Sequence, residues 1–253
     1  MHIVVFTGGG FPLPETTENY WKSTSCPDYV VAADSGLCAC EAYAEFWKEE
    51  YDFSPDVILG DMDSLPSAEK KLKKYSSKQI ILHDPYKDYT DTELALEHAH
   101  SYAERAGKGS HKFITLIGGN GGRLDHLLGI FDLFATELRP SVWLCGSQAV
   151  WFAPEGSRFD VSGVSPKNPV SIARVNGMPR IGGVINSSGL EWESGSFRNK
   201  GMPSISNRIS KKNYKEGMPV KLSVIEGIFL LIFPVTALVS FVVSPPDPAA
   251  FTF

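Results

Sequence analysis

The chain has 253 residues, of which 43% are hydrophobic and 21% are charged, and its formal net charge is −5. This composition is ordinary for a globular protein and leaves room for two domains. A mildly acidic chain argues against a nucleic acid as partner, and four scattered cysteines form neither a disulfide scaffold nor a complete zinc site.

The first 145 residues alternate between apolar runs of strand length and stretches with helical periodicity. The predicted strands are 3–6, 29–33, 56–59, 79–82, 113–117 and 142–145. The predicted helices are 36–50, 91–106 and 124–138, each with apolar residues at a spacing close to 3.6. Such alternation is typical of an α/β domain with a mostly parallel sheet, and runs without polar alternation indicate strands that are buried on both faces.

Helical periodicity fades after residue 145, and Pro and Gly separate short apolar runs. These runs are 170–175, 183–186, 189–193, 220–226 and 228–233. We therefore expect an all-β, sandwich-like domain over 146–253, after an α/β domain over 1–145.

The two ends of the chain bear on its location. Residues 1–6 lack the basic segment and long apolar core of a signal peptide. Residues 227–246 contain no charge, but Pro234 interrupts them, and two strands joined at that proline fit better than a membrane span. We expect a cytoplasmic protein without a membrane partner.

Polar clusters follow five of the predicted strands. In a parallel sheet these strand ends lie at one edge, where ligands bind. Each cluster alone could be a turn, but their shared position favours a binding site. They are 7–10, 34–36, 61–64, 87–91 and 118–123.

Asp61 and Asp63 lie one residue apart, directly after an apolar run. Two carboxylates this close repel each other unless a cation lies between them. Mg²⁺ is a hard ion that binds one or two carboxylates and fills its remaining positions with phosphate oxygens or water. A solvated turn is the alternative for an isolated pair, but Asp88 and Asp91 follow the next predicted strand and could join the same metal.

The segment 87–93 combines a charged group with a helix start. Thr90 and Glu93 have the spacing of a capping box. Lys87 offers a point charge suited to a phosphate.

The glycine-rich turn 118–123 leads into a predicted helix, whose N-terminus favours phosphate. Arg123 can bind phosphate oxygens with two nitrogens, whereas His126 is as well explained by a structural role. Acids for a metal, with bases and glycines for phosphate, indicate phosphoryl-type transfer.

Taken together, these motifs resemble the thiamine pyrophosphokinase family. The segments that carry the resemblance are 33–36, 60–64, 87–96, 118–126 and the pair Ser206-Asn207. The resemblance implies an α/β nucleotide-binding domain, a β-sandwich domain for thiamine binding and dimerisation, and a homodimer with its active sites between subunits. It also implies a Mg²⁺-dependent reaction of ATP with thiamine that gives thiamine diphosphate and AMP.

The resemblance assigns roles to individual residues. Those expected to bind the metal are Asp61, Asp63 and Asp91, and those expected to be catalytic are Asp61, Asp91 and Arg123. Those expected to bind ATP are Asp34, Ser64, Lys87, Asp88, Thr90, Arg123, Asp125 and His126. Ser206 and Asn207 are expected to contact thiamine.

Three positions depart from the family pattern, and two rival functions stay open. Ser35 replaces a glycine, and Arg208 and Ile209 replace an acidic and an aromatic residue after the Ser-Asn pair. The rivals are a pyrophosphokinase acting on a hydroxymethylpterin and a nucleotide-sensing module without catalysis.

Overall fold

A computed structural model of the protein describes residues 1–175, 183–194 and 204–243. The chain divides into two compact units. Unit 1 contains residues 1–15, 25–133 and 138–146, and unit 2 contains residues 16–24, 134–137 and those from 147 onward.

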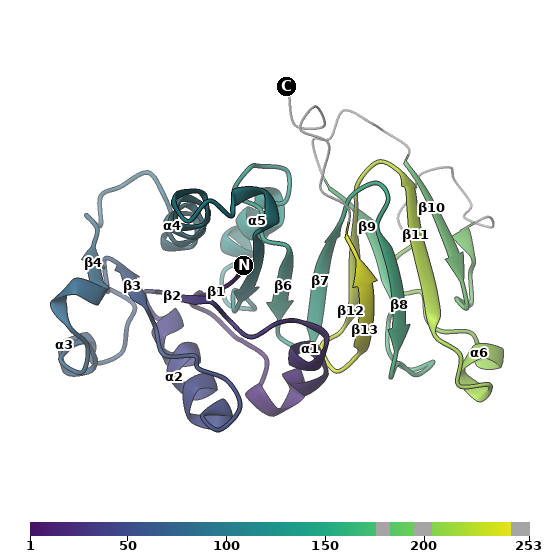
Figure 1. Ribbon diagram of the computed structural model, residues 1–253, viewed down its shortest axis with the longest axis horizontal. Coiled ribbons are helices and arrows are strands. Elements are labelled where there is room, and N and C mark those ends of the chain that lie inside the picture. Colours follow the sequence, from purple (N-terminus) through teal and green to yellow (C-terminus); the bar gives the residue numbers. More distant parts are fainter. Residues whose placement is uncertain (176–182, 195–203, 244–253) are drawn as a thin grey trace. The chain divides into compact units, whose positions relative to one another are not determined.

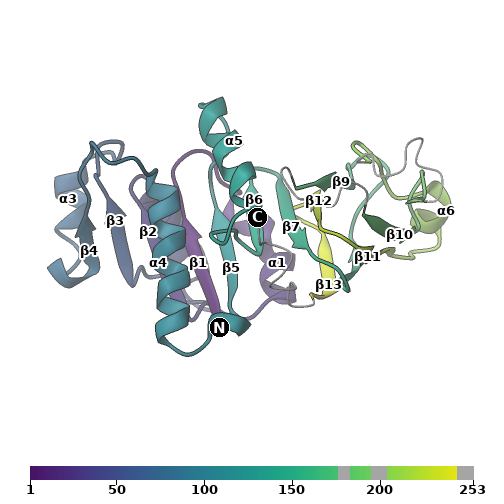
Figure 2. The same ribbon diagram turned by 90° about the horizontal axis from the view of Figure 1, so that it is seen from above.

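Unit 1 is built on six parallel strands with the order β4-β3-β2-β1-β5-β6. The strands are β1 His2–Phe6, β2 Tyr29–Ala33, β3 Val57–Gly60, β4 Ile80–Leu82, β5 Phe113–Ile117 and β6 Val142–Cys145. Figure 2 shows them side by side in this order. The fold class predicted from the alternating pattern is confirmed.

Helices cover both faces of this sheet. They are α2 Gly36–Trp47, α3 Ala68–Leu72, α4 Asp91–Arg105 and α5 Leu124–Leu133. Figure 1 shows α4 on one face and α2 on the other. This explains why β1, β2 and β3 are apolar throughout, since almost every residue in them is buried.

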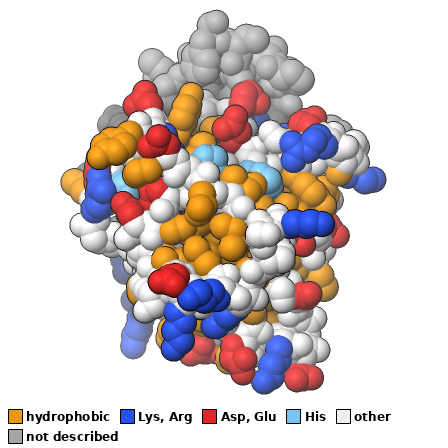
Figure 3. All heavy atoms as spheres, turned by 90° about the vertical axis from the view of Figure 1, so that its left-hand side faces the viewer, with side chains coloured by type: hydrophobic (Ala, Val, Ile, Leu, Met, Phe, Trp, Pro, Cys, Tyr) orange, Lys and Arg blue, Asp and Glu red, His pale blue; other side chains and the backbone are white. Residues whose placement is uncertain are grey.

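β4 is the exception because it forms an edge of the sheet. Its residues are half-buried or exposed, and Leu82 is 69% exposed. Figure 3 faces the side of the molecule on which β4 and α3 lie in Figure 1, and hydrophobic side chains gather at its centre with charged ones around them.

Unit 2 contains two sets of antiparallel strands, as expected for a sandwich. One set has the order β7-β12-β9 and the other has the order β10-β11-β8-β13. The strands are β7 Gln148–Ala153, β8 Arg158–Ser162, β9 Ser171–Arg174, β10 Val184–Ser188, β11 Val220–Glu226, β12 Phe229–Pro234 and β13 Leu238–Val242. Two short α-helices also lie in the described part of this unit, α1 Glu18–Ser23 and α6 Lys211–Lys215.

Aromatic rings from both sheets form the core of unit 2. The ring centroid of Trp151 on β7 lies 5.8 Å from that of Phe159 on β8 and 4.7 Å from that of Phe241 on β13. The two strands joined near Pro234 are β12 and β13, as predicted. Across the described residues, no helix has the length and apolar character needed to cross a membrane.

One predicted strand was wrong. Residues 189–193 form a turn in which only Leu190 makes a single bridge, to Ile209. The carboxylate of Glu193 accepts hydrogen bonds from the hydroxyl of Ser187 and the backbone N–H of Gly189, and these bonds fold the segment back on itself.

Candidate functional site

Three aspartates come together at the carboxyl edge of the sheet in unit 1. Asp34 follows β2, Asp61 follows β3 and Asp91 begins α4. One carboxylate oxygen of each lies within 4.8 Å of those of the other two. Neighbouring strands cause this convergence, since the N–H of Asp34 donates to the carbonyl of Leu59 at 2.8 Å.

Gly60 allows these acids to approach one another. Its φ of +137° lies in a region that only glycine adopts readily. A Cβ atom on Gly60 would lie 3.1 Å from Cβ of Asp34 and 3.2 Å from Cγ of Asp91. A side chain at this position would therefore press on two of the three acids.

Asp34 is the most enclosed member of the group, with 5% of its surface exposed. One of its carboxylate oxygens, Oδ2, accepts a short hydrogen bond from the hydroxyl of Ser64. The other, Oδ1, is buried without a hydrogen-bond partner among the described residues. A buried carboxylate oxygen that lacks a partner is costly, and a bound cation would remove that cost.

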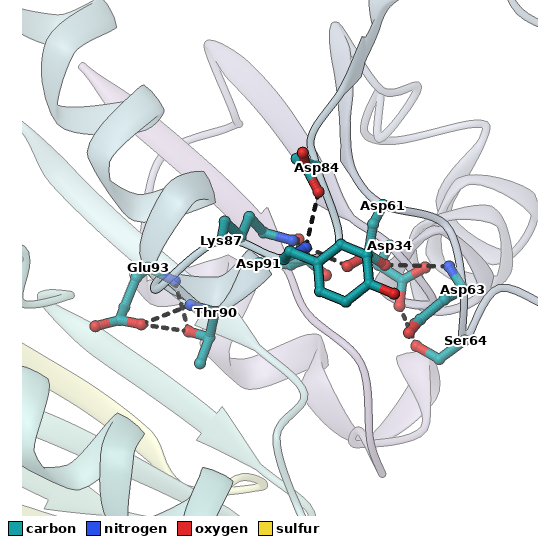
Figure 4. Close-up of polar contacts among 10 residues, drawn as sticks. Asp34, Asp61, Asp63, Ser64, Asp84, Lys87, Thr90, Asp91 and Glu93 are labelled. Carbon is teal, nitrogen blue, oxygen red and sulfur yellow. Dashed lines mark hydrogen bonds and ion pairs between the residues drawn. The ribbon is translucent and has the colours of Figure 1, made fainter.

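Lys87 lies between the other two acids, as Figure 4 shows. Its Nζ is 2.9 Å from Oδ2 of Asp61 and 3.0 Å from Oδ1 of Asp91. The hydrogen bond from Lys87 lowers the pKa of Asp61. Burial raises the pKa of Asp91, and the negative charges of Asp61 and Asp34 add to this rise. The single ammonium of Lys87 therefore does not neutralise the negative charge of the three carboxylates.

Asp63, which the sequence predicted as a metal ligand, lies outside this group, whereas Asp34, which it predicted as an ATP-binding residue, lies inside it. Met62, between Asp61 and Asp63, has a φ of +63° and a buried side chain. This conformation turns the chain so that the backbone N–H of Asp63 donates to Oδ1 of Asp61 at 3.2 Å, while the Asp63 side chain is exposed.

The predicted capping box at the start of α4 is confirmed. The N–H of Glu93 donates to Oγ1 of Thr90 at 3.2 Å, and the N–H of Thr90 donates to the Glu93 carboxylate at 2.8 Å. Figure 4 shows this exchange beside the acids. The cap fixes the first turn of α4 and thereby the position of Asp91, whereas Asp88 is exposed and does not belong to the acidic group.

The glycine-rich turn after β5 joins the turn after β1. The N–H of Gly119 donates to the carbonyl of Gly8, and that of Gly10 donates to the carbonyl of Asn120 at 2.7 Å. Gly118 has a φ of +118°, and a Cβ there would lie 2.3 Å from the carbonyl oxygen of Thr7. The glycines thus permit close backbone contact between two neighbouring strand ends.

Arg123 and Asp125 form an exposed pair at the start of α5. Two guanidinium nitrogens of Arg123 contact the carboxylate of Asp125, at 3.2 and 2.5 Å. These hydrogen bonds lower the pKa of Asp125 to about 2. His126 is exposed next to them. Among the described residues, no hydrogen bond or ion pair joins this pair to the three aspartates.

The pair Ser206-Asn207 lies in unit 2, and its two members differ. Ser206 is exposed and has a φ of +62°. Asn207 is fully buried. Its amide nitrogen donates to the carbonyl of Trp192 and to the hydroxyl of Ser204, and its amide oxygen accepts from the N–H groups of Trp192 and Arg208. An asparagine amide has two donors and two acceptor positions, so Asn207 is saturated and acts as a clamp between two loops.

Trp192 was not among the predicted site residues, yet it stands beside this pair. The residue is 48% exposed, and the guanidinium carbon of Arg208 lies 5.0 Å from the centroid of the Trp192 ring. Ile209 is buried, so it is not available to a ligand in the way that the family's aromatic residue would be. A tryptophan placed between two acids in a polar stretch is the sequence signal that could have identified this position.

Comparisons with known proteins bear on the family and on the fold. Residues 17–144 match the family model described as thiamin pyrophosphokinase, catalytic domain. A search of curated proteins finds no match.

Three solved structures illustrate the similarity. The thiamin pyrophosphokinase of Candida albicans has a TM-score of 0.63 and 15% identity, over 92% of this chain and 88% of that one. The thiamine pyrophosphokinase of Bacillus subtilis has a TM-score of 0.62 and 17% identity, over 92% and 99%. A thiamin pyrophosphokinase family protein of Enterococcus faecalis has a TM-score of 0.61 and 19% identity, over 92% and 99%. At these identities the structures support the fold.

Proposed function

The chain belongs to the thiamin pyrophosphokinase family, and from this premise we propose that it transfers a pyrophosphate group from ATP to the hydroxyl group of thiamine. The hydroxyl oxygen attacks the β-phosphorus, the bond from that phosphorus to the α,β-bridging oxygen breaks, and AMP leaves with that oxygen. The hydroxyl proton passes to a carboxylate of the acidic cluster. Thiamine diphosphate and AMP are the products.

The observation that carries this proposal is the acidic group at the strand ends. Asp34, Asp61 and Asp91 supply only oxygen ligands, which suit a hard divalent cation such as Mg²⁺. The unpartnered buried oxygen of Asp34 fits the same interpretation. We propose these three as the metal ligands. When bound, Mg²⁺ would neutralise phosphate charge.

The residues that the sequence predicted to bind ATP form the proposed ATP site, and Asp34 belongs to it as well as to the metal ligands. Lys87 and Arg123 have the charge for phosphate oxygens, and Ser64 and Thr90 bring hydroxyl groups to the same edge of unit 1. The full proposed set is Asp34, Ser64, Lys87, Asp88, Thr90, Arg123, Asp125 and His126. Within it, Arg123 must exchange its contact with Asp125 for phosphate.

Residues 146–253 are proposed to bind thiamine and to form a homodimer. Ser206 is the exposed member of the pair and contacts thiamine, whereas Asn207 holds the loop that presents it. Light scattering after size-exclusion chromatography tests the homodimer. The cytoplasmic location is also part of the proposal, and fractionation of the source cells tests it.

The nucleotide product tests the reaction. The protein is incubated with Mg²⁺, ATP and thiamine, and the nucleotides are separated by chromatography. We expect AMP and thiamine diphosphate in equal amounts, and neither without thiamine or Mg²⁺. ADP as product would contradict pyrophosphate transfer, AMP formed with a hydroxymethylpterin instead of thiamine would favour the pterin enzyme, and ATP binding without turnover would favour the sensing module.

A further inference from the structure

The Lys87 side chain lies within the proposed metal site. Its ammonium contacts the same two carboxylates, those of Asp61 and Asp91, that are proposed to bind the cation. The Lys87 side chain is 14% exposed, so it is inserted into the cluster. A lysine directed at phosphate, as the sequence predicted, would have to leave these carboxylates.

Mg²⁺ and the Lys87 ammonium would repel each other if both stayed on these carboxylate oxygens. Mg²⁺ binds carboxylate oxygens at about 2.0–2.1 Å, and an ammonium that stays on them would lie beside a double positive charge. Three carboxylates and one ammonium carry a formal charge of −2, so the cluster still attracts a divalent ion while Lys87 is present. A metal that binds here gains three carboxylates but has to replace the ammonium.

The fold lets the lysine move while the acids stay. Asp61 follows β3, and Asp91 lies in the capped first turn of α4, so both are held by regular structure. Lys87 lies in the irregular segment between β4 and α4, and its ammonium sits at the end of a flexible four-carbon chain. It can therefore swing away without displacing either carboxylate.

We propose that Lys87 is an internal counter-ion that a divalent cation displaces, and that the released ammonium then binds a phosphate of the nucleotide. This inference rests on the proposed metal site. It predicts that metal binding favours nucleotide binding, and by linkage that nucleotide binding favours the metal. In the metal-free protein, the Lys87 ammonium reduces the repulsion among the three carboxylates.

The accessibility of the Lys87 amine tests this directly. The unmodified protein is treated with an amine-reactive acetylating ester, with and without Mn²⁺, and acetylation of each lysine is followed by peptide mass spectrometry. We expect Mn²⁺ to raise the rate at Lys87 by about fivefold or more, the low end of typical coupling between ligands. Lys71 is the matched control, because it is 23% exposed and paired with Glu41 at 2.6 Å away from this site. Its rate should not change.

A binding measurement separates this inference from the metal site itself. Free Mn²⁺ is measured by electron paramagnetic resonance for the unmodified protein, for Lys87→Met and for Lys87→Arg. We expect Lys87→Met to bind Mn²⁺ about tenfold more tightly than the unmodified protein and Lys87→Arg to differ little from it, since tenfold corresponds to about 1.4 kcal/mol. Mn²⁺ binding with unchanged acetylation at Lys87 would overturn the displacement and leave the metal site standing. If neither the unmodified protein nor a folded Lys87→Met protein bound Mn²⁺, both would be overturned.

Discussion

The Gly60→Ala substitution tests whether the close approach of the aspartates depends on a missing side chain. The φ of +137° is unfavourable for alanine, and holding a residue in such a region costs about 1–3 kcal/mol. The new methyl group would meet Asp34 at 3.1 Å and Asp91 at 3.2 Å, and overpacking of this kind costs about another 1–3 kcal/mol. We therefore expect the free energy of unfolding to fall by about 2–6 kcal/mol, with weaker Mn²⁺ binding.

Gly107→Ala is the matched control in the same unit. Gly107 also has a positive φ, +67°, but a Cβ there would meet nothing within 4 Å. Its substitution should cost only the left-handed penalty of about 1–2 kcal/mol and leave Mn²⁺ affinity unchanged. Urea unfolding followed by tryptophan fluorescence gives both free energies, provided that the slope against urea is the same in all three proteins. Equal destabilisation by the two substitutions, or unaltered Mn²⁺ binding in Gly60→Ala, would refute the steric argument.

Three further predictions concern the acids, the clamp and a buried histidine. Asp91→Asn should lower turnover by at least about 100-fold, because the loss of a residue that only supports a metal ligand already costs up to about 100-fold. The melting temperature of the metal-free protein should not fall. Near-normal turnover would remove Asp91 from the site. Asn207→Ala should lower the free energy of unfolding in urea by about 1–3 kcal/mol, because it leaves buried hydrogen-bonding partners unpaired. Ser206→Ala should raise the KM for thiamine with little effect on stability. If Ser206→Ala destabilised the protein and Asn207→Ala only raised the KM, the two roles would be exchanged. Burial lowers the pKa of His2 from 6.5 to about 4, so the unfolded chain binds more protons between these values. Stability should be full above pH 6.5 and fall by on the order of 3 kcal/mol as the pH drops to 4. His2→Asn should reduce this loss, and an unchanged slope of unfolding free energy against pH would contradict the assignment.

The parallel sheet was predictable because its strands carry an unambiguous pattern. Residues 29–33, 113–117 and 142–145 were placed without error, since largely apolar runs of strand length between amphipathic helices are typical of buried parallel strands. The helix expected over 124–138 ends at Leu133, because the next four residues turn away and group with unit 2. The strands β7 and β8 were missed. Only alternate residues of β8 are buried, which gives a weaker signal than a fully apolar run, whereas β7 is buried almost throughout and was overlooked despite its apolar sequence.

The site was predictable in its position and less so in its members. Because ligands bind at the strand ends of a parallel sheet, the sequence predicted that Asp61 and Asp91 lie close together. The structure adds Asp34, which follows the neighbouring strand. The sequence could not reveal that Met62 adopts a left-handed conformation and turns Asp63 outward, because nothing in a methionine predicts it. Nor could it reveal that Asn207 is saturated, since two of its hydrogen bonds are made with the backbone of Trp192, in a separate loop.

The three aspartates belong to chain segments that are distant in sequence and become neighbours only when β2, β3 and the start of α4 are in place. These aspartates are far apart in the unfolded chain, so a cation held by all three would bind the native state alone and stabilise it. At a free concentration one hundred times its dissociation constant, it would add about 2.7 kcal/mol to the stability of the protein. The resistance of the protein to heat and to proteases should then vary with the concentration of free divalent cation.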